Sequence, residues 1–116
     1  MTKLVGITGG IGSGKTTFSN HLKELGYMVH ESDAVVSEIY NNPKKQFLSF
    51  IKEKISQNAT NHNKINKTAI ANAIFNNNKI KKLLEKRIHK EVQVSREAFI
   101  KKYTKKKKKI IFADIP

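Results

Sequence analysis

The chain has 116 residues, a formal net charge of +14 and no cysteine. Its length fits one domain, and the lack of cysteine excludes disulfide bonds and thiolate metal sites. No apolar run approaches the roughly 20 residues that a membrane-spanning helix needs, and glycines appear before any secretory apolar segment develops. We therefore expect a soluble, cytoplasmic protein with no membrane partner.

The positive charge suggests an anionic partner such as nucleic acid, an acidic lipid or a phosphorylated small molecule. Almost all of the cations are lysines, however, and asparagine is also abundant. Joint enrichment in lysine and asparagine is what an AT-rich coding sequence produces, and lysine is poorly suited to bidentate recognition. We favour coding bias over a nucleic-acid footprint. We also favour a solvated connection for the run from Lys105 to Lys109, because the chain stays basic without it.

Apolar patterning predicts strands that alternate with helices. Strands separated by helices cannot pair as hairpins, so we expect a parallel sheet covered by helices. Ser32 or Asp33 is the expected N-cap of the second helix. The expected elements are a strand at 3–8, a helix at 15–25 capped by Gly26, a strand at 27–30, helices at 34–40 and 44–56, a loop at 57–66, a short apolar stripe at Ile70 and Ile74, a helix from Lys79 that extends as far as Phe99, and a strand at 110–113.

A glycine-rich segment between the first strand and the first helix matches the P-loop pattern of Gly, four residues, Gly-Lys-Ser/Thr. It reads Gly9-Gly10-Ile11-Gly12-Ser13-Gly14-Lys15-Thr16. Glycines let successive backbone N–H groups face a polyphosphate, and the N-terminus of the following helix adds unpaired amides and a positive dipole end. The segment therefore predicts ATP binding. The alternative is a glycine-rich turn with a chance Lys-Thr, which the flanking strand and helix disfavour.

The polar residues at the end of this segment have separate expected roles. Lys15 should reach the β- and γ-phosphates and stabilise charge during transfer, and the Thr16 hydroxyl should ligate Mg²⁺. Thr17 is placed for a further phosphate contact. These roles add Mg²⁺ to ATP as an expected cofactor.

Asp33 follows the second predicted strand, so it should lie at the same carboxyl edge of the sheet as the P-loop. A carboxylate there can orient and deprotonate an acceptor hydroxyl. It can equally well cap the helix that follows. Position and chemistry alone leave both roles open. Glu31 would share the face of Asp33 if the strand continues that far.

The chain resembles the dephospho-CoA kinase family along its whole length. The resemblance is most specific in Thr8–Thr17, continues in Leu25-Gly26 and Asp33, and is weaker at Ile65-Asn66-Lys67, Ile74-Phe75, Ile88-His89 and Asp114-Ile115-Pro116. That family transfers the γ-phosphate of ATP to the ribose 3′-hydroxyl of dephospho-CoA. The resemblance implies that Asp33 activates this hydroxyl and, with Lys15, is catalytic.

The same resemblance implies two further roles. Asp114 ends an apolar strand in the manner of a Walker B motif and would orient Mg²⁺ through water. His89 would contact the substrate, although a lone histidine on a helix is more often structural. The chain also departs from the family pattern: Glu31-Ser32-Asp33 replaces Asp-Ala-Asp, Ser37 replaces an arginine, and Lys90 replaces a proline.

The fold class implied is α/β, a P-loop NTPase-type parallel sheet with flanking helices that lacks its last strands and its lid. We expect residues 1–116 to form a single incomplete kinase domain, with phosphate-binding elements in 1–33, a helical substrate region in 34–104 and a third strand in 110–116. In the family's sheet order, 2-3-1-4-5, the absence of strands four and five exposes the first strand as an edge.

Family members are longer and carry arginines in the missing lid, so we expect this chain alone to be poorly active and marginally stable. It would be a truncated form, or half of a protein that another chain completes. Two other functions stay open. One is a P-loop kinase for a different small molecule, which a substrate panel would reveal. The other is a non-catalytic basic fragment that binds nucleotide or nucleic acid through residues 105–109.

Overall fold

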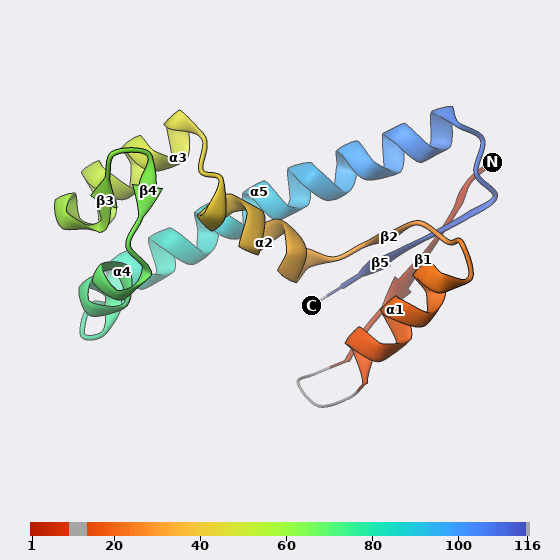
Figure 1. Ribbon diagram of the computed structural model, residues 1–116, viewed down its shortest axis with the longest axis horizontal. Helices are drawn as coiled ribbons and strands as arrows, with labels where there is room; N and C mark the ends of the chain where they lie inside the picture. Colours follow the sequence, from red (N-terminus) through yellow and green to blue (C-terminus); the bar gives the residue numbers. More distant parts are fainter. Residues whose placement is uncertain (10–13, 116) are drawn as a thin grey trace. The chain divides into compact units, whose positions relative to one another are not determined.

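The computed structural model describes residues 1–9 and 14–115. The chain forms two compact units, one made of Met1–Asp33 with Val92–Pro116 and the other of Ala34–Glu91. The long helix α5 (Asn78–Lys105) contributes residues to both units (Figure 1). Within the described residues, no helix combines the length and apolar character needed to cross a membrane.

The first unit is built on a three-stranded parallel sheet in the order β1-β5-β2. The strands are β1 (Lys3–Ile7), β5 (Ile110–Asp114) and β2 (Val29–His30). The central strand of this sheet is buried, since Ile111 and Ala113 of β5 have no exposed surface. The parallel sheet predicted from sequence is confirmed, and so is the position of β1 at an edge. This order also matches the first three strands of the order that the resemblance implies.

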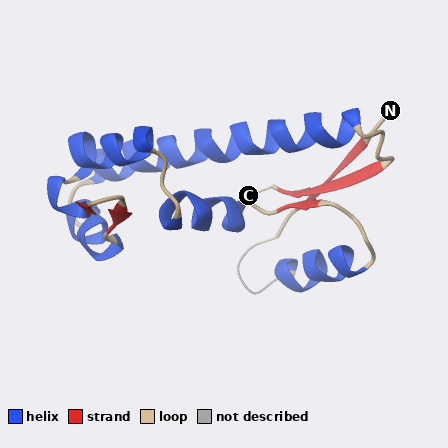
Figure 2. Ribbon diagram, turned by 45° about the horizontal axis from the view of Figure 1, so that its top comes forward, coloured by secondary structure: helices blue, strands red, loops and turns tan. Residues whose placement is uncertain are grey.

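Helices cover both sides of this sheet. Helix α1 (Lys15–Glu24) lies on one side, and the C-terminal part of α5 lies on the other (Figure 2). Helix α1 ends in a Schellman motif, in which the Tyr27 N–H donates to the Leu22 carbonyl (3.0 Å) and the Gly26 N–H donates to the Lys23 carbonyl (2.9 Å). Gly26 has φ of 92°, a left-handed conformation that favours glycine. The predicted C-terminal cap is therefore confirmed.

The second unit contains most of α2 (Ser32–Asn41), followed by a series of short elements. It also holds the N-terminal part of α5. The short elements are α3 (Lys45–Phe50), the π-helix η1 (Ile51–Ile55), the 3₁₀ helix η2 (Gln57–Ala59), strands β3 (Thr60–Asn61) and β4 (Lys64–Ile65), and α4 (Lys67–Ile74).

Two predictions for this unit need correction. The expected loop at 57–66 instead forms the 3₁₀ helix η2 and a hairpin, with Thr60 opposite Ile65 and Asn61 opposite Lys64. Strands of two residues are too short to show an alternating apolar pattern, so periodicity could not reveal them. The helix expected at 44–56 widens at its end, because the Ser56 N–H donates to the Ile51 carbonyl five residues back (2.9 Å).

The core of the second unit is centred on Phe47, whose side chain is 1% exposed. Its ring packs edge-on against Tyr40, with centroids 5.7 Å apart, and tilts against Phe50 at 6.2 Å. The other buried members of this cluster come from the π-helix, the 3₁₀ helix and the two flanking helices: Ile51, Ile55, Ala59, Ile70 and Leu84. The unit therefore has an apolar core of its own.

Replacing Phe47 should destabilise this unit strongly. We expect Phe47→Ala to lower the free energy of unfolding by about 3–5 kcal/mol, since it removes a buried ring and leaves a cavity. Urea denaturation followed by circular dichroism measures the loss. Phe75 is 82% exposed, so Phe75→Ala is the matched control and should change stability by less than about 0.5 kcal/mol. Equal losses in the two variants would contradict the assigned core.

His30, the last residue of β2, is a buried polar group in the first unit, with 6% of its side chain exposed. Its Nε2 lies 3.0 Å from the Ser95 hydroxyl, and its ring packs against that of Phe99. Its Nδ1 atom finds no hydrogen-bond partner among the described residues. Burial lowers the pKa of His30 below 6.5; the Asp114 carboxylate opposes this shift and the Arg96 guanidinium adds to it.

The lowered pKa predicts that the fold weakens in mild acid. The unfolded chain takes up a proton at this position near pH 6.5, whereas the folded chain resists it until lower pH. Stability from neutral His30 is therefore complete above about pH 6.5 and is lost as the pH falls through the folded pKa. Urea denaturation at several pH values should show this slope, and His30→Gln should flatten it. His89→Gln, at an exposed position, should leave the slope unchanged.

Candidate functional site

The candidate site lies at the carboxyl edge of the sheet in the first unit. In the parallel register, Ile7 of β1 pairs with Asp114 of β5, and His30 of β2 pairs with Ala113. The chain leaves β1 towards the glycine-rich segment and leaves β2 directly into α2 (Figure 1). Ligands of open parallel sheets bind at this edge. The structure therefore brings the start of α1, the start of α2 and the end of β5 to one edge.

Among the described residues, no side chain of the N-cap residue caps the N-terminus of α1. Gly14 is the N-cap residue, has φ of 82°, and offers no side chain to the first-turn amides. Among the described residues, a Cβ atom placed on Gly14 would meet nothing within 4 Å, so its backbone conformation is the feature that favours glycine here. The first turn also contains no acidic residue. First-turn amides without a side-chain cap, at a positive dipole end with no acid in that turn, favour a phosphate group.

The predicted phosphate-binding residues fall partly within the described structure. Lys15 is half-buried at the start of α1, and Thr16 and Thr17 are exposed in the same turn. Gly9, at the other end of the segment, follows β1 with φ of 154°. The remaining residues predicted to bind ATP, Gly10, Ile11, Gly12 and Ser13, lie outside the described residues.

Asp33 is the second residue of α2, and its side chain is exposed. Ser32 and Asp33 both lie inside the helix, so the prediction that one of them is its N-cap is wrong. The helix begins two residues earlier than its sequence pattern indicated, because a residue from another strand contacts its first amide. Asp33 is thus left with an accessible carboxylate in the first helical turn.

Asp114 is the residue that contacts the start of α2. The residue is buried, with 5% of its surface exposed. The Ser32 N–H donates to both of its oxygens, at 2.8 Å (Oδ1) and 3.0 Å (Oδ2), and the Ser32 hydroxyl donates to Oδ1 at 2.6 Å. Sequence reasoning gave Ser32 only a capping role within its own helix and no contact with Asp114. A capping signal was present, but it pointed to the wrong partner, since the acceptor lies 82 positions away.

Two more contacts anchor the segment that leads to Asp33. Glu31 forms an ion pair with Lys23 near the end of α1, so its carboxylate is directed to a cation of the protein. His30, one residue earlier, contacts Ser95 of α5. Its lowered pKa keeps the ring neutral at neutral pH, which avoids a buried positive charge beside the edge.

His89 lies on the part of α5 that belongs to the second unit, where it is exposed. The same unit has a shallow open groove that sequence reasoning missed. Its lining includes Phe50, over which Arg87 lies at 4.9 Å from the ring centroid, while Arg87 also pairs with Glu91. Helical spacing placed Phe50 and Arg87 on separate helices and gave no signal that they meet. The other lining residues are Lys45, Gln46, Ser49, Glu53 and Lys54.

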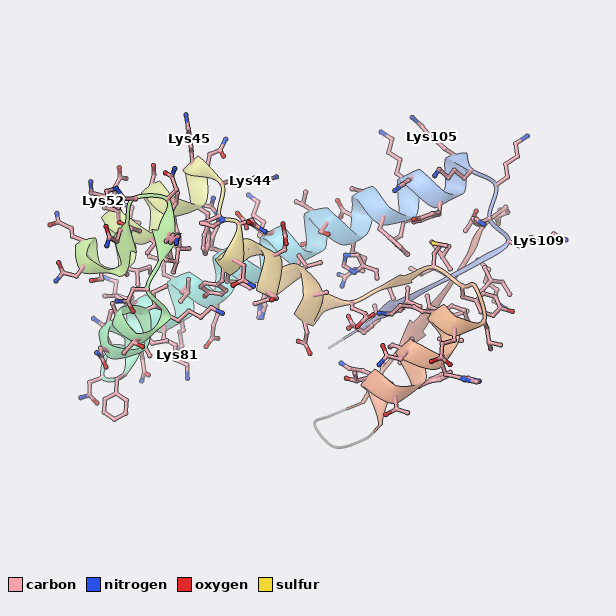
Figure 3. The ribbon with its side chains drawn as sticks, in the orientation of Figure 1. Lys44, Lys45, Lys52, Lys81, Lys105 and Lys109 are labelled. Carbon is pink, nitrogen blue, oxygen red and sulfur yellow. The ribbon has the colours of Figure 1, made fainter. Side chains whose placement is uncertain are left out.

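The lysines are spread over both units. Figure 3 shows Lys44, Lys45, Lys52 and Lys81 extending from the second unit, and Lys105 and Lys109 from the first. Residues 105–109 are all exposed and lead from the end of α5 to β5. This confirms the solvated connection expected from sequence.

The described residues contain no group of three or more histidine, aspartate or glutamate side chains that could hold a metal ion. A P-loop magnesium site needs fewer protein ligands, because Mg²⁺ keeps several waters and binds phosphate oxygens. The Thr16 hydroxyl and the Asp114 carboxylate supply oxygen atoms at the same sheet edge, so the residues present fit such a site. The metal roles of Thr16 and Asp114 stay predictions.

Comparison with known proteins identifies the family. A family model described as dephospho-CoA kinase matches residues 3–116. The chain is 32% identical over 114 residues to a dephospho-CoA kinase from Bartonella quintana, which covers 98% of the chain and 57% of the relative. It is 38% identical over 93 residues to one from Buchnera aphidicola, with 79% and 44% covered.

Solved structures give the same fold. A dephospho-CoA kinase from Campylobacter jejuni aligns with a TM-score of 0.77 at 23% identity, over the whole chain and 58% of that structure. A protein from Thermus thermophilus aligns with a TM-score of 0.67 at 27% identity, over 99% of the chain and 56% of that structure. The α/β fold class is thereby confirmed. The chain spans little more than half the length of these proteins, and it belongs to the dephospho-CoA kinase family.

Proposed function

We propose that this chain carries the ATP-binding and hydroxyl-activating residues of a dephospho-CoA kinase, acting in the cytoplasm. The reaction transfers the γ-phosphate of ATP to the ribose 3′-hydroxyl of dephospho-CoA and yields coenzyme A and ADP. The observation that carries the proposal is the N-terminus of α1, where Gly14 at φ of 82° provides no side-chain cap, at the same sheet edge as the exposed Asp33.

Nucleotide binding follows from the start of α1. Backbone amides of residues 9–16 would contact the phosphates, and the Lys15 ammonium would stabilise the charge on the β- and γ-phosphates. Thr16, with Asp114 acting through water, would hold Mg²⁺, which neutralises phosphate charge when bound. Thr17 would add a hydroxyl contact to phosphate.

Transfer follows from Asp33. Its carboxylate would accept the proton of the ribose 3′-hydroxyl while that oxygen forms a bond to the γ-phosphorus. The bond from the γ-phosphorus to its bridging oxygen breaks, and ADP leaves. Asp33 is suited to this role because its side chain is exposed and is not used as a cap. Residues 34–104 would form the substrate region, in which His89 would contact dephospho-CoA.

The chain spans only part of the length of its relatives, and we expect this to limit its activity. It covers 57% of the length of the Bartonella relative, so about two-fifths of that protein has no counterpart in the 116 residues. We propose that full turnover needs this remainder, from the same or another chain, and that residues 1–116 alone turn over slowly. A rate equal to that of a full-length family member would overturn this part of the proposal.

Nucleotide binding is tested with Lys15→Ala. We expect the affinity for Mg·ATP, measured by isothermal titration calorimetry, to fall at least about tenfold, because a charge-assisted contact to phosphate is lost. Lys109→Ala removes the same charge from an exposed position and should leave the affinity within twofold. If the wild-type chain is folded but does not bind Mg·ATP, the proposed function fails.

The role of Asp33 is tested with Asp33→Asn. We expect the rate of ADP formation with dephospho-CoA to fall about 10²–10⁴-fold, the usual contribution of a general base, while Mg·ATP affinity is retained. Glu38→Gln neutralises another exposed acid on α2 and is the matched control. A panel of other hydroxylated acceptors belongs in the same assay, because preference for one of them would point to a different P-loop kinase.

A further inference from the structure

Three successive residues before Asp33 are each anchored to a different element of the first unit. His30 contacts Ser95 of α5, Glu31 pairs with Lys23 of α1, and Ser32 donates its N–H and its hydroxyl to Asp114 of β5. Asp33 comes next, and its side chain is exposed. The segment is therefore fixed up to the residue before the proposed base.

The contact between Ser32 and Asp114 is the best defined of the three. It consists of three hydrogen bonds to one carboxylate, at 2.6, 2.8 and 3.0 Å. Hydrogen bonds to a charged group are about twice as strong as those between neutral groups. The carboxylate also lies at the positive dipole end of α2, which stabilises it further. Asp114 thus performs, from another strand, the capping role that a neighbouring side chain usually has.

The position of Asp114 makes this contact a rigid one. It belongs to β5, the central strand, where Ile111 and Ala113 have no exposed surface and both edges are paired. Asp114 as a whole is 5% exposed. A carboxylate held by a buried central strand can transmit the sheet geometry to the first turn of α2. We call the contact between Ser32 and Asp114 the clamp. Asp33 is one peptide unit beyond the Ser32 amide that the clamp holds. The direction of the Asp33 side chain therefore depends on the first turn of α2.

We propose that Asp114 is a positioning residue, which acts through Ser32 to hold the Asp33 carboxylate at the angle that the transfer reaction needs. This inference rests on the proposed function, because it takes Asp33 as the base. It adds a second role to Asp114, and that role is separable from metal binding. The Ser32 hydroxyl contributes to the clamp without changing the Asp114 carboxylate.

The chain offers a direct spectroscopic test. Asp33 and Asp114 are its only aspartates, so labelling aspartate with ¹³C at the carboxyl carbon gives two signals, and Asp114→Asn leaves only that of Asp33. We expect this variant to shift and broaden the Asp33 signal, although the substitution lies 81 positions away. Glu31→Gln, which neutralises another acid of the segment but leaves the clamp intact, should change the Asp33 signal less.

Hydrogen exchange measures the clamp itself. We expect Ser32→Ala to speed exchange of the Ser32 and Asp33 amides about tenfold, in the range of a lost helix cap, and Asp114→Asn to speed it more. Ser37→Ala, a serine substitution further along α2, is the matched control and should leave both amides unchanged. Unchanged exchange in both clamp variants would overturn the proposal.

Kinetics separate positioning from metal binding and from a general loss of structure. We expect Ser32→Ala to lower kcat about threefold to tenfold while Mg·ATP affinity stays within twofold, and Ser32→Thr, which restores a hydroxyl, to recover part of the rate. Faster amide exchange with an unchanged Asp33 signal and unchanged kcat would show that the clamp is structural only. A wild-type chain that fails to bind Mg·ATP would overturn the proposed function instead, since exchange and the Asp33 signal are read without nucleotide.

Discussion

Parallel pairing of β5 between β1 and β2 is the constraint on which the candidate site depends. β1 and β2 do not pair with each other, so each is placed by its own contact with β5. This strand begins at Ile110, 79 residues of intervening chain after the end of β2 at His30. The carboxyl edge exists only once that distant strand has entered the sheet. The start of α1, the start of α2 and Asp114 are then brought to one edge together.

The second unit lowers the entropic cost of closing the long connection between β2 and β5. Closing a flexible loop of this length between β2 and β5 costs conformational entropy. The cost rises with the number of free residues in the loop, although only slowly. Residues 34–91 instead form a compact unit of their own, with a buried cluster around Phe47. Its contacts are local compared with those of the sheet, and local contacts form quickly. A structured insertion therefore reduces the amount of free chain between β2 and β5.

Much of this architecture could be predicted from sequence, because its signals are local. The helix from Lys15, its cap at Gly26 and the parallel arrangement of the strands follow from apolar spacing and glycine placement. The hairpin at 60–65 could not be predicted, since its strands have two residues each. The widened turn at Ile51 depends on core packing. The start of α2 was misplaced for a similar reason: its first amide is bound by Asp114, and no local pattern can name a partner 82 positions away.

The two helices that start at the carboxyl edge differ in whether acidic side chains compensate the positive dipole end at their N-terminus. Helix α1 begins at Gly14, with no capping side chain and no acid in its first turn. Helix α2 begins against the Asp114 carboxylate and carries Asp33 in its first turn. A helix N-terminus attracts anions unless nearby carboxylates already compensate its dipole. Under the proposed function, a polyphosphate at this edge would be drawn to α1 and repelled from α2. Of these two acids, Asp114 is buried against Ser32 and Asp33 is exposed, so Asp33 is the one that the proposed function takes as the base, at the same sheet edge as the proposed phosphate site.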